Sequence, residues 1–300
     1  MRFPKFSGEW EICKVSELLD FYSTNSLSWE QLEYGEKAMM NLHYGLIHVG
    51  LPTMVDLRRD KLPNVKEGNM PKNFELCKEG DVAFADASED TNEVAKVIEL
   101  FNLDNKDIVC GLHTIHGRDN KNKTIVGFKG YAFSSSAFHN QIRRIAQGTK
   151  IYSISTKNFS ECYVGIPSKA EQTKIATLLR LIDERIATQN KIIEDLKKLK
   201  SAISQLLLFK SDLLEKRIPL SEVSALKNGY PFLSSSYDST GEYEVLTIAN
   251  VTGERYICSE GCNRILTKPS DIQFHQTLKA NDILISLTGN VGRVSLCKEG

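Results

Sequence analysis

The fold is decided by one stretch of sequence, IPSKAEQTKIATLLRLIDERI, which occupies residues 166–186. Directly after its proline, Ser168 and Glu171 form a capping-box pattern, in which the serine hydroxyl accepts from an amide of the first turn and the glutamate reaches back to the cap. No glycine or proline then occurs before Pro219. The pattern predicts a helix from Ser168 to about Phe209, roughly 63 Å long at 1.5 Å per residue.

This predicted helix carries an apolar stripe with the spacing of a coiled coil. Steps of three and four residues alternate along it, with one slip of register near Leu196. The stripe consists of Ile175, Leu179, Ile182, Ile186, Ile193, Leu196, Leu199, Ile203 and Leu206. So long a stripe cannot be buried against a small domain alone and needs a second helix. We identify no such helix within the chain and expect two copies to pair, in antiparallel orientation.

The 166 residues before the helix have the mixed pattern of an α/β (α+β) domain. Short apolar runs separated by Gly, Asn and Asp predict strands at 82–84, 108–110 and 151–154. Helical candidates lie at 93–101 and 136–145. We therefore predict a first domain over 1–166, a helical spacer over 167–216, and part of a second domain over 217–300.

The last segment repeats features of the first. Residues 220–223 (LSEV) echo 15–18 (VSEL), and 281–285 (NDILI) echo 80–84 (GDVAF), at similar offsets of 205 and 201 positions. Two matches in the same order at similar spacing predict an internal repeat. We expect the second copy to be incomplete at Gly300.

Composition restricts how the chain could bind its partners. Lysine and arginine number 38, aspartate and glutamate also 38, so the formal charge is zero, and any binding of nucleic acid must use local patches or partner proteins. The seven scattered cysteines suit reduced thiols in the cytoplasm, without disulfides. No apolar run approaches the roughly 20 residues of a membrane span.

Three polar segments have the residue types that read DNA, since Arg and Lys pair with guanine, Asn and Gln with adenine, and all of them with phosphate. A loop over 116–123 contributes Arg118, Asn120, Lys121 and Lys123, although a solvated hairpin would explain it equally well. The predicted helix over 136–145 contributes Asn140, Arg143 and Arg144. A glycine turn then adds Gln147, Thr149 and Lys150.

Sequence motifs for catalysis are missing. The chain has no GxGxxG, no GxxxxGK[ST], no GxSxG and no HExxH, and it lacks the Pro-Pro of a methylase tetrapeptide. Two histidine pairs, His43 with His48 and His113 with His116, have spacings that favour satisfied core or loop histidines over metal ligands. We predict a non-catalytic chain without a metal site.

Residues 166–186 resemble the central region of specificity subunits of type I restriction-modification systems, with the pattern IPxxxEQxKIAxxLxxIDxxI. The segment HYGLIH at 43–48 is similar to a HYGDIH segment of that family, except that Leu46 stands where the family often has Asp. Gly80-Asp81-Val82 is similar to a GDI segment.

The resemblance implies two target-recognition domains, each reading half of a split DNA site, spaced by a helix that also docks methyltransferase subunits. It adds His43, Tyr44 and His48 to the candidate DNA contacts. Methylation and ATP-dependent cleavage would be performed by partner methyltransferase and restriction (translocase) subunits, which would hold S-adenosylmethionine, ATP and Mg. A rival hypothesis is a coiled-coil scaffold that reads no DNA.

Overall fold

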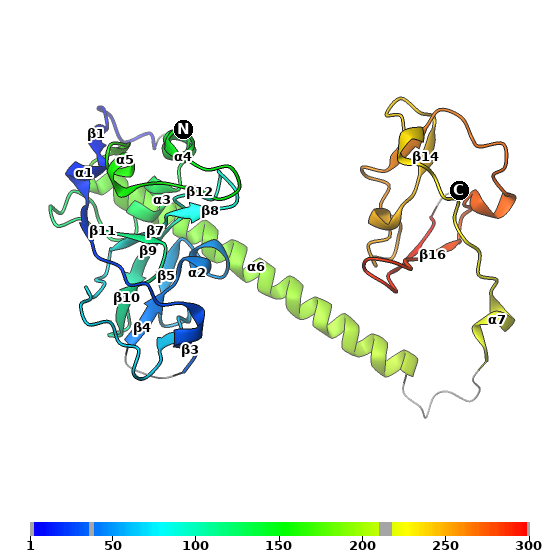
Figure 1. Cartoon of the computed structure of the whole chain (residues 1–300), viewed down its shortest axis with the longest axis horizontal. Helices are drawn as coiled ribbons and strands as arrows, with labels where there is room; N and C mark the ends of the chain where they lie inside the picture. Colours follow the sequence, from blue (N-terminus) through cyan, green and yellow to red (C-terminus); the bar gives the residue numbers. More distant parts are fainter. Residues whose placement is uncertain (1–2, 36–38, 210–217, 299–300) are drawn as a thin grey trace. The chain divides into compact units, whose positions relative to one another are not determined.

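The computed structural model describes residues 3–35, 39–209 and 218–298, and the chain divides into two compact units, Met1–Ser201 and Ala202–Gly300 (Figure 1). The boundary predicted near 216 lies outside the described residues. None of the described helices is long and apolar enough to cross a membrane.

Unit 1 contains two main sheets. The larger has the strand order β2-β11-β7-β9-β5 and consists of β2 (Asp20–Tyr22), β11 (Thr114–Arg118), β7 (Val82–Ala85), β9 (Val97–Asn102) and β5 (Met54–Asp56). Its neighbours are antiparallel except for β5 and β9. The smaller has the order β10-β4-β6-β3 and consists of β10 (Asp107–Cys110), β4 (Met39–Leu42), β6 (Asn64–Val65) and β3 (Leu32–Glu33).

Short helices and strand pairs complete unit 1. The helices are α1 (Val15–Leu18), η1 (Trp29–Gln31), α2 (Tyr44–His48), α3 (Lys129–Phe133), α4 (Ser136–Ile145) and α5 (Thr156–Ser160). The strand pairs are β1 (Glu11–Lys14) with β13 (Tyr163–Ile166), and β8 (Ala87–Ser88) with β12 (Tyr152–Ser153). Because β1 pairs with the last strand of unit 1, both ends of the unit are fixed just before the long helix begins.

Four buried phenylalanines form the centre of the main core. Phe84 of β7 meets Phe133 of α3 and Phe159 of α5 edge to face, with ring centroids 5.1 and 4.7 Å apart, and Phe138 of α4 closes the cluster. Edge-to-face packing is the favoured geometry of aromatic pairs. The helices α3, α4 and α5 are thereby held against β7.

The helix predicted over 93–101 is wrong, because residues 97–102 form β9 in the middle of the larger sheet. Its first four residues are all buried, since β7 and β5 pair with its two edges and both faces are covered. A strand buried on both faces lacks the alternation that distinguishes strand from helix. The strands predicted at 82–84 and 108–110 and the helix over 136–145 are confirmed; of the strand predicted over 151–154, the structure forms only Tyr152–Ser153.

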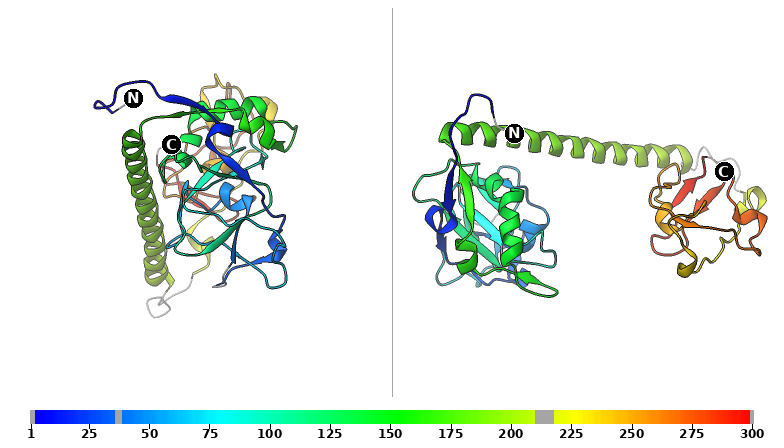
Figure 2. Two further views of the ribbon diagram at one scale, coloured as in Figure 1. Left: turned by 90° about the vertical axis from the view of Figure 1, so that its left-hand side faces the viewer. Right: turned by 90° about the horizontal axis from the view of Figure 1, so that it is seen from above.

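The long helix, α6 (Lys169–Phe209), begins where its capping box predicts, and in Figure 2 it is one continuous helix that passes along one side of unit 1. Ser168 Oγ accepts from the amide of Glu171 at 3.4 Å. Gln172, which is fully buried, attaches the helix to unit 1: its Oε1 accepts from the amide of Ile125 at 2.9 Å, and its Nε2 donates to the carbonyls of Pro167 and Lys123 at 2.9 and 3.1 Å.

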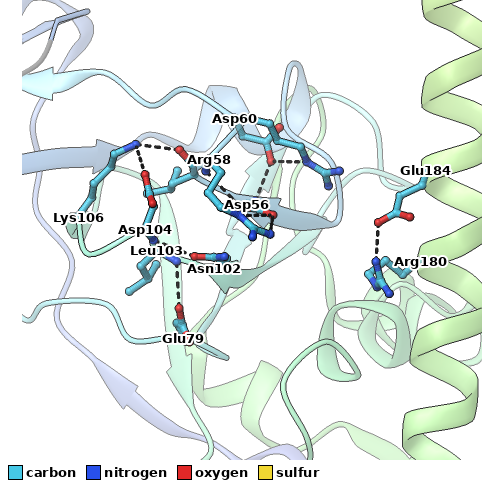
Figure 3. A network of polar contacts seen from close by, with 12 residues as sticks. Asp56, Arg58, Asp60, Glu79, Asn102, Leu103, Asp104, Lys106, Arg180 and Glu184 are labelled. Carbon is cyan, nitrogen blue, oxygen red and sulfur yellow. Dashed lines mark hydrogen bonds and ion pairs between the residues drawn. The ribbon is translucent and has the colours of Figure 1, made fainter.

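Further along, polar contacts continue between the first turns of α6 and unit 1. Tyr131 of α3 donates to Asp183 at 2.8 Å, and burial together with this carboxylate raises the pKa of the tyrosine. Arg180 pairs with Glu184 on the same helix at 2.6 Å (Figure 3), and its guanidinium lies 6.0 Å from the ring centroid of Phe101 in β9, next to the loop that follows this strand. That loop contains a separate ion pair, that of Lys106 with Asp104 at 3.2 Å.

Unit 2 is a smaller set of short elements. They are α7 (Leu220–Val223), η3 (Ser234–Ser236), β14 (Tyr243–Val245), η4 (Ile248–Asn250), β15 (Asn263–Ile265), η5 (Phe274–Gln276), β16 (Ile283–Ile285) and β17 (Val294–Leu296). β14 pairs with β15, and β16 with β17, both antiparallel.

The predicted repeat is confirmed at both matching segments. Residues 15–18 and 220–223 each form a four-residue helix. Before β7, the amide of Lys78 donates to Asp81 at 2.8 Å, and before β16 the amide of Lys279 donates to Asp282 at the same distance. The turn residues Gly80 and Asn281 both have positive φ, a region in which glycine and asparagine are the favoured residues.

Replacing Gln172 tests the attachment of α6. Gln172→Ala leaves one buried amide and two carbonyls without their partner and is expected to lower the free energy of unfolding of unit 1 by about 3 kcal/mol, measured by urea denaturation. Thr173→Ala is the control, because Thr173 is exposed and its hydroxyl bonds only the carbonyl of Lys169 within the helix. If the two variants had the same free energy of unfolding, the attachment of α6 through Gln172 would be contradicted.

Candidate nucleic-acid interface

The first candidate segment, 116–123, is not a solvated loop throughout. Residues 114–118 form β11 and are all buried, so the prediction of Arg118 as an exposed reader of DNA is wrong. Its guanidinium donates to both oxygens of Asp81, at 2.9 and 2.8 Å, and to Glu75 at 2.7 Å. It also lies over the ring of Tyr22, 4.4 Å from the centroid. The guanidinium of Arg118 is thus bonded within the domain and is not exposed to DNA.

Asp81 is the centre of this buried network. Besides Arg118 it bonds Nε2 of His116 at 2.7 Å, and both partners are buried with it. Burial alone would raise the pKa of the Asp81 carboxyl, but the bonds to His116 and Arg118 outweigh burial and lower it. The network therefore holds an ionised carboxylate in the core and fixes β11 against the turn before β7.

The rest of the segment, 119–123, is exposed or half-buried, but its polar groups bond the N-terminal part of unit 1. Asn120 donates to Asp20 and to the hydroxyl of Tyr22, both at 2.7 Å. Lys121 donates to the carbonyl of Glu17 at 2.8 Å, and Lys123 pairs with Glu11 at 2.6 Å. These bonds tie the segment to α1, β1 and β2. These bonds, rather than the solvated hairpin that was the alternative for this segment, account for the residues without a contact to DNA.

The segment at 43–48 forms the short helix α2. His43 is its buried N-cap, and Nδ1 accepts from the amide of Gly45 at 3.1 Å, while burial and the nearby His113 lower the pKa of its ring. His48, at the other end, bonds the carbonyl of Ala87 at 2.9 Å. Tyr44 packs against His113 with centroids 5.3 Å apart. Because His43 is buried, we remove it from the candidate DNA contacts, whereas Tyr44 and His48 are half-buried and stay predictions.

The candidates of α4 and the following turn all lie on the surface. Asn140, Arg143 and Arg144 are exposed on α4, as are Gln147, Thr149 and Lys150 directly after it. Arg143 bonds Asn140 on the same helix and donates to Asn92 at 2.8 Å. The turn is closed by the bridge of Gln147 with Ser153.

The segment 86–93 links this surface to α2. His48 bonds Ala87 and lies 3.8 Å from Glu93, while Asn92 bonds Arg143. The structure therefore brings α2, the 86–93 segment, α4 and the 147–150 turn into one neighbourhood, which we call the α4 surface. Its charge is mixed, because Glu89 and Asp90 are exposed there beside Arg143, Arg144 and Lys150.

Along α6 the apolar stripe is uncovered beyond the first turns. Ile175 and Leu179 are half-buried, whereas the stripe from Ile182 to Leu206 has side chains 45–58% exposed. The exposed members are Ile182, Ile186, Ile193, Leu196, Leu199, Ile203 and Leu206. An apolar surface of this length is typical of a site for another protein.

Comparison with known families identifies the domain that carries these features. Residues 60–198 match the profile of the family described as "Type I restriction modification DNA specificity domain". This part of the chain is therefore similar to a type I restriction modification DNA specificity domain. The matched range includes α4, the 147–150 turn, Gln172 and the first 30 residues of α6. The resemblance of 166–186 to specificity subunits is thereby confirmed.

Solved structures show that the fold around the specificity domain is shared. The crystal structure of a type I restriction-modification system S subunit from M. genitalium is similar, with a TM-score of 0.51 and 16% identity, over 100% of this chain and 73% of that one. A structure described for complex assembly and conformational transition of a type I R-M system has a TM-score of 0.54 and 15% identity, over 98% and 73%. No curated protein matches the sequence significantly. The predicted architecture of mixed α/β units with a long helix is confirmed.

Breaking the Asp81 network tests its role in the specificity domain. Asp81→Asn leaves Arg118 buried without its full counter-charge and is expected to cost about 3 to 5 kcal/mol of unfolding free energy near neutral pH. Because the folded state lowers the pKa of Asp81, this contribution is complete above the ordinary carboxyl pKa of about 3.9 and is lost as pH falls through the lower folded value.

The measurement is urea denaturation of both proteins from pH 7 down to pH 3. The control is Asp104→Asn, which removes a solvent-exposed pair with Lys106 and is expected to cost less than about 1 kcal/mol. If the difference in unfolding free energy between wild type and Asp81→Asn grew toward acid pH, the proposed role of the ionised Asp81 carboxylate would be contradicted.

Proposed function

We propose that this chain is the DNA sequence-specificity subunit of a type I restriction-modification complex. The observation that carries the proposal is the match of residues 60–198 to the specificity domain, because this range contains the 86–93 segment, α4, the 147–150 turn and the first part of the uncovered helix. In this proposal, unit 1 reads one half of a bipartite target, and unit 2 belongs to a second reader. The comparisons give no support to a scaffold that reads no DNA.

The α4 surface supports base reading better than the other candidates. On a helix, residues three and four apart are neighbours, so Asn140, Arg143 and Arg144 present amide and guanidinium groups from one end of α4. These are the groups that pair with adenine and guanine in the major groove. By contrast, the polar groups of 118–123 bond strands and helix α1 of unit 1, whereas the bonds of Arg143 go to the exposed side chains of Asn92 and Asn140.

The overall charge determines how the complex holds DNA. A chain with 38 positive and 38 negative side chains releases few counterions, so affinity must come from specific contacts and from the methyltransferase subunits. We propose that those subunits and restriction (translocase) subunits perform the chemistry and hold S-adenosylmethionine, ATP and Mg, while this chain is non-catalytic. A cytoplasmic location follows from this proposal.

DNA binding tests the α4 surface directly. In complex with the methyltransferase subunits, Arg143→Ala with Arg144→Ala is expected to weaken binding to the target duplex at least tenfold, because one bidentate base contact is worth about 1 to 3 kcal/mol. The target is first found by methylome sequencing of the source cells, and binding is measured by fluorescence anisotropy at several salt concentrations.

The control removes two positive charges elsewhere, with Lys121→Ala and Lys123→Ala, and is expected to bind almost like wild type. If the lysine pair lost affinity and the arginine pair did not, the α4 surface would be the wrong reader. If the wild-type complex bound target and scrambled duplex equally, the proposed function itself would fail.

We also propose that the stripe of α6 packs against a helix of a second copy of the chain. No other described helix covers it, and its period is that of a two-stranded coiled coil. The paired helices would then set the distance between two DNA-reading units and provide the surface that binds methyltransferase subunits.

Ile186→Glu with Ile193→Glu places charges inside this seam and is expected to convert dimers to monomers in analytical ultracentrifugation. Ala187→Glu with Thr188→Glu adds the same charge on a different face and should leave the dimer intact. A wild-type chain that stays monomeric at tens of micromolar would exclude pairing of two copies.

A further inference from the structure

Three side chains that bind metals meet in the core of unit 1, although the sequence separates them widely. Cys77 precedes β7, Cys110 ends β10, and His116 lies in β11. The two Sγ atoms are 3.6 Å apart, and a ring nitrogen of His116 lies within 4.8 Å of both. All three side chains are buried, with 6% or less of each residue exposed.

One ring nitrogen of His116 has no hydrogen-bond partner. Its Nε2 lies 2.7 Å from Asp81, and since a carboxylate only accepts, this nitrogen carries the proton. In the neutral ring, which is the form that binds metals, Nδ1 then has a free lone pair, and this atom is buried without any hydrogen-bond partner. A buried acceptor without a partner costs free energy and requires a physical explanation.

We propose that Sγ of Cys77, Sγ of Cys110 and Nδ1 of His116 bind one zinc ion. Metal-bound histidines usually donate their other nitrogen to a carboxylate, which is the bond that His116 makes to Asp81. With Zn–S bonds of about 2.3 Å in a tetrahedron, two thiolates lie about 3.8 Å apart, close to the separation of the two sulfurs here. The fourth position is left for a water molecule.

The charges of this site balance. Binding releases two thiol protons to solvent, and the resulting thiolates neutralise the divalent ion, so the core gains no net charge. A disulfide between the same cysteines would need an S–S bond of about 2.05 Å and would still leave Nδ1 of His116 without a partner. Zinc accounts for all three side chains together.

A zinc ion here would join the two sheets of unit 1. Cys110 belongs to the smaller sheet, His116 to the larger, and Cys77 lies on the segment that bonds β10 through the amide of Cys77 and the carbonyl of Ile108, 2.8 Å apart. The site adjoins the Asp81 network, because His116 is common to both. The proposed metal would thus hold β10 of the smaller sheet against β11 of the larger sheet.

Elemental analysis of the full chain, purified without chelator and dialysed, tests the proposal. Wild type is expected to contain about one zinc per chain, as is Cys162→Ser, which removes a buried cysteine of unit 1 outside the cluster. Cys77→Ser and Cys110→Ser are each expected to lose the zinc. Cobalt added to metal-free wild type should produce thiolate-to-metal absorption that each cluster variant reduces.

A second readout does not depend on the folding of variants. In wild type, Cys77 and Cys110 should resist alkylation until a strong chelator is added, as mapped by mass spectrometry of peptides. The proposal is overturned if wild type supplied with zinc retains none after dialysis, if the cluster variants retain as much as wild type, or if a Cys77–Cys110 disulfide is found. None of these outcomes depends on whether the chain reads DNA.

Discussion

The side chain of Gln172 fixes the first turn of the long helix to the rest of unit 1, and the direction of the apolar stripe along α6 depends on those hydrogen bonds. It accepts from the amide of Ile125 and donates to the carbonyls of Pro167 and Lys123, so the first turn of α6 is held by backbone groups just before the helix and in the 123–125 segment. Three bonds to a buried amide determine the direction of a helix far better than apolar contact, which is not directional. Because these bonds hold its first turn rigidly, the helix could keep a fixed distance between the DNA-reading units in the proposed function.

A second constraint is the ionised core of unit 1. Asp81 makes the same turn bond as Asp282 in the repeat, but in unit 1 it also holds His116 and Arg118. The same local sequence thus serves as a simple turn in one unit and as the centre of a buried charge network in the other. This network occupies the guanidinium of Arg118, one of the arginines that the sequence offers to DNA, and it is the reason why we propose base reading at the exposed α4 surface.

The sequence predicted the elements whose signal is local. The capping box at Ser168, the uninterrupted stripe of α6, the helix at 136–145 and the repeated turn before β7 and β16 all depend on neighbours within a few residues. The failures have a common cause, which is tertiary environment. Because strand β9 is buried on both faces, its sequence does not alternate between apolar and polar residues. Arg118 is buried in the core because Asp81, 37 positions earlier in the sequence, neutralises its charge. The cluster of Cys77, Cys110 and His116 has no short spacing to detect.

The central claim is that the first turns of α6 are part of the core of unit 1, whereas the exposed stripe further along α6 is to be covered by another helix. Amide hydrogen exchange of the unmodified chain, at a concentration low enough to prevent pairing, measures this directly. The account predicts that amides of 173–180 exchange as slowly as those of β7, β9 and β11, in one cooperative opening, and that those of 186–206 exchange much faster. Equal and fast exchange along the whole of α6 would contradict it.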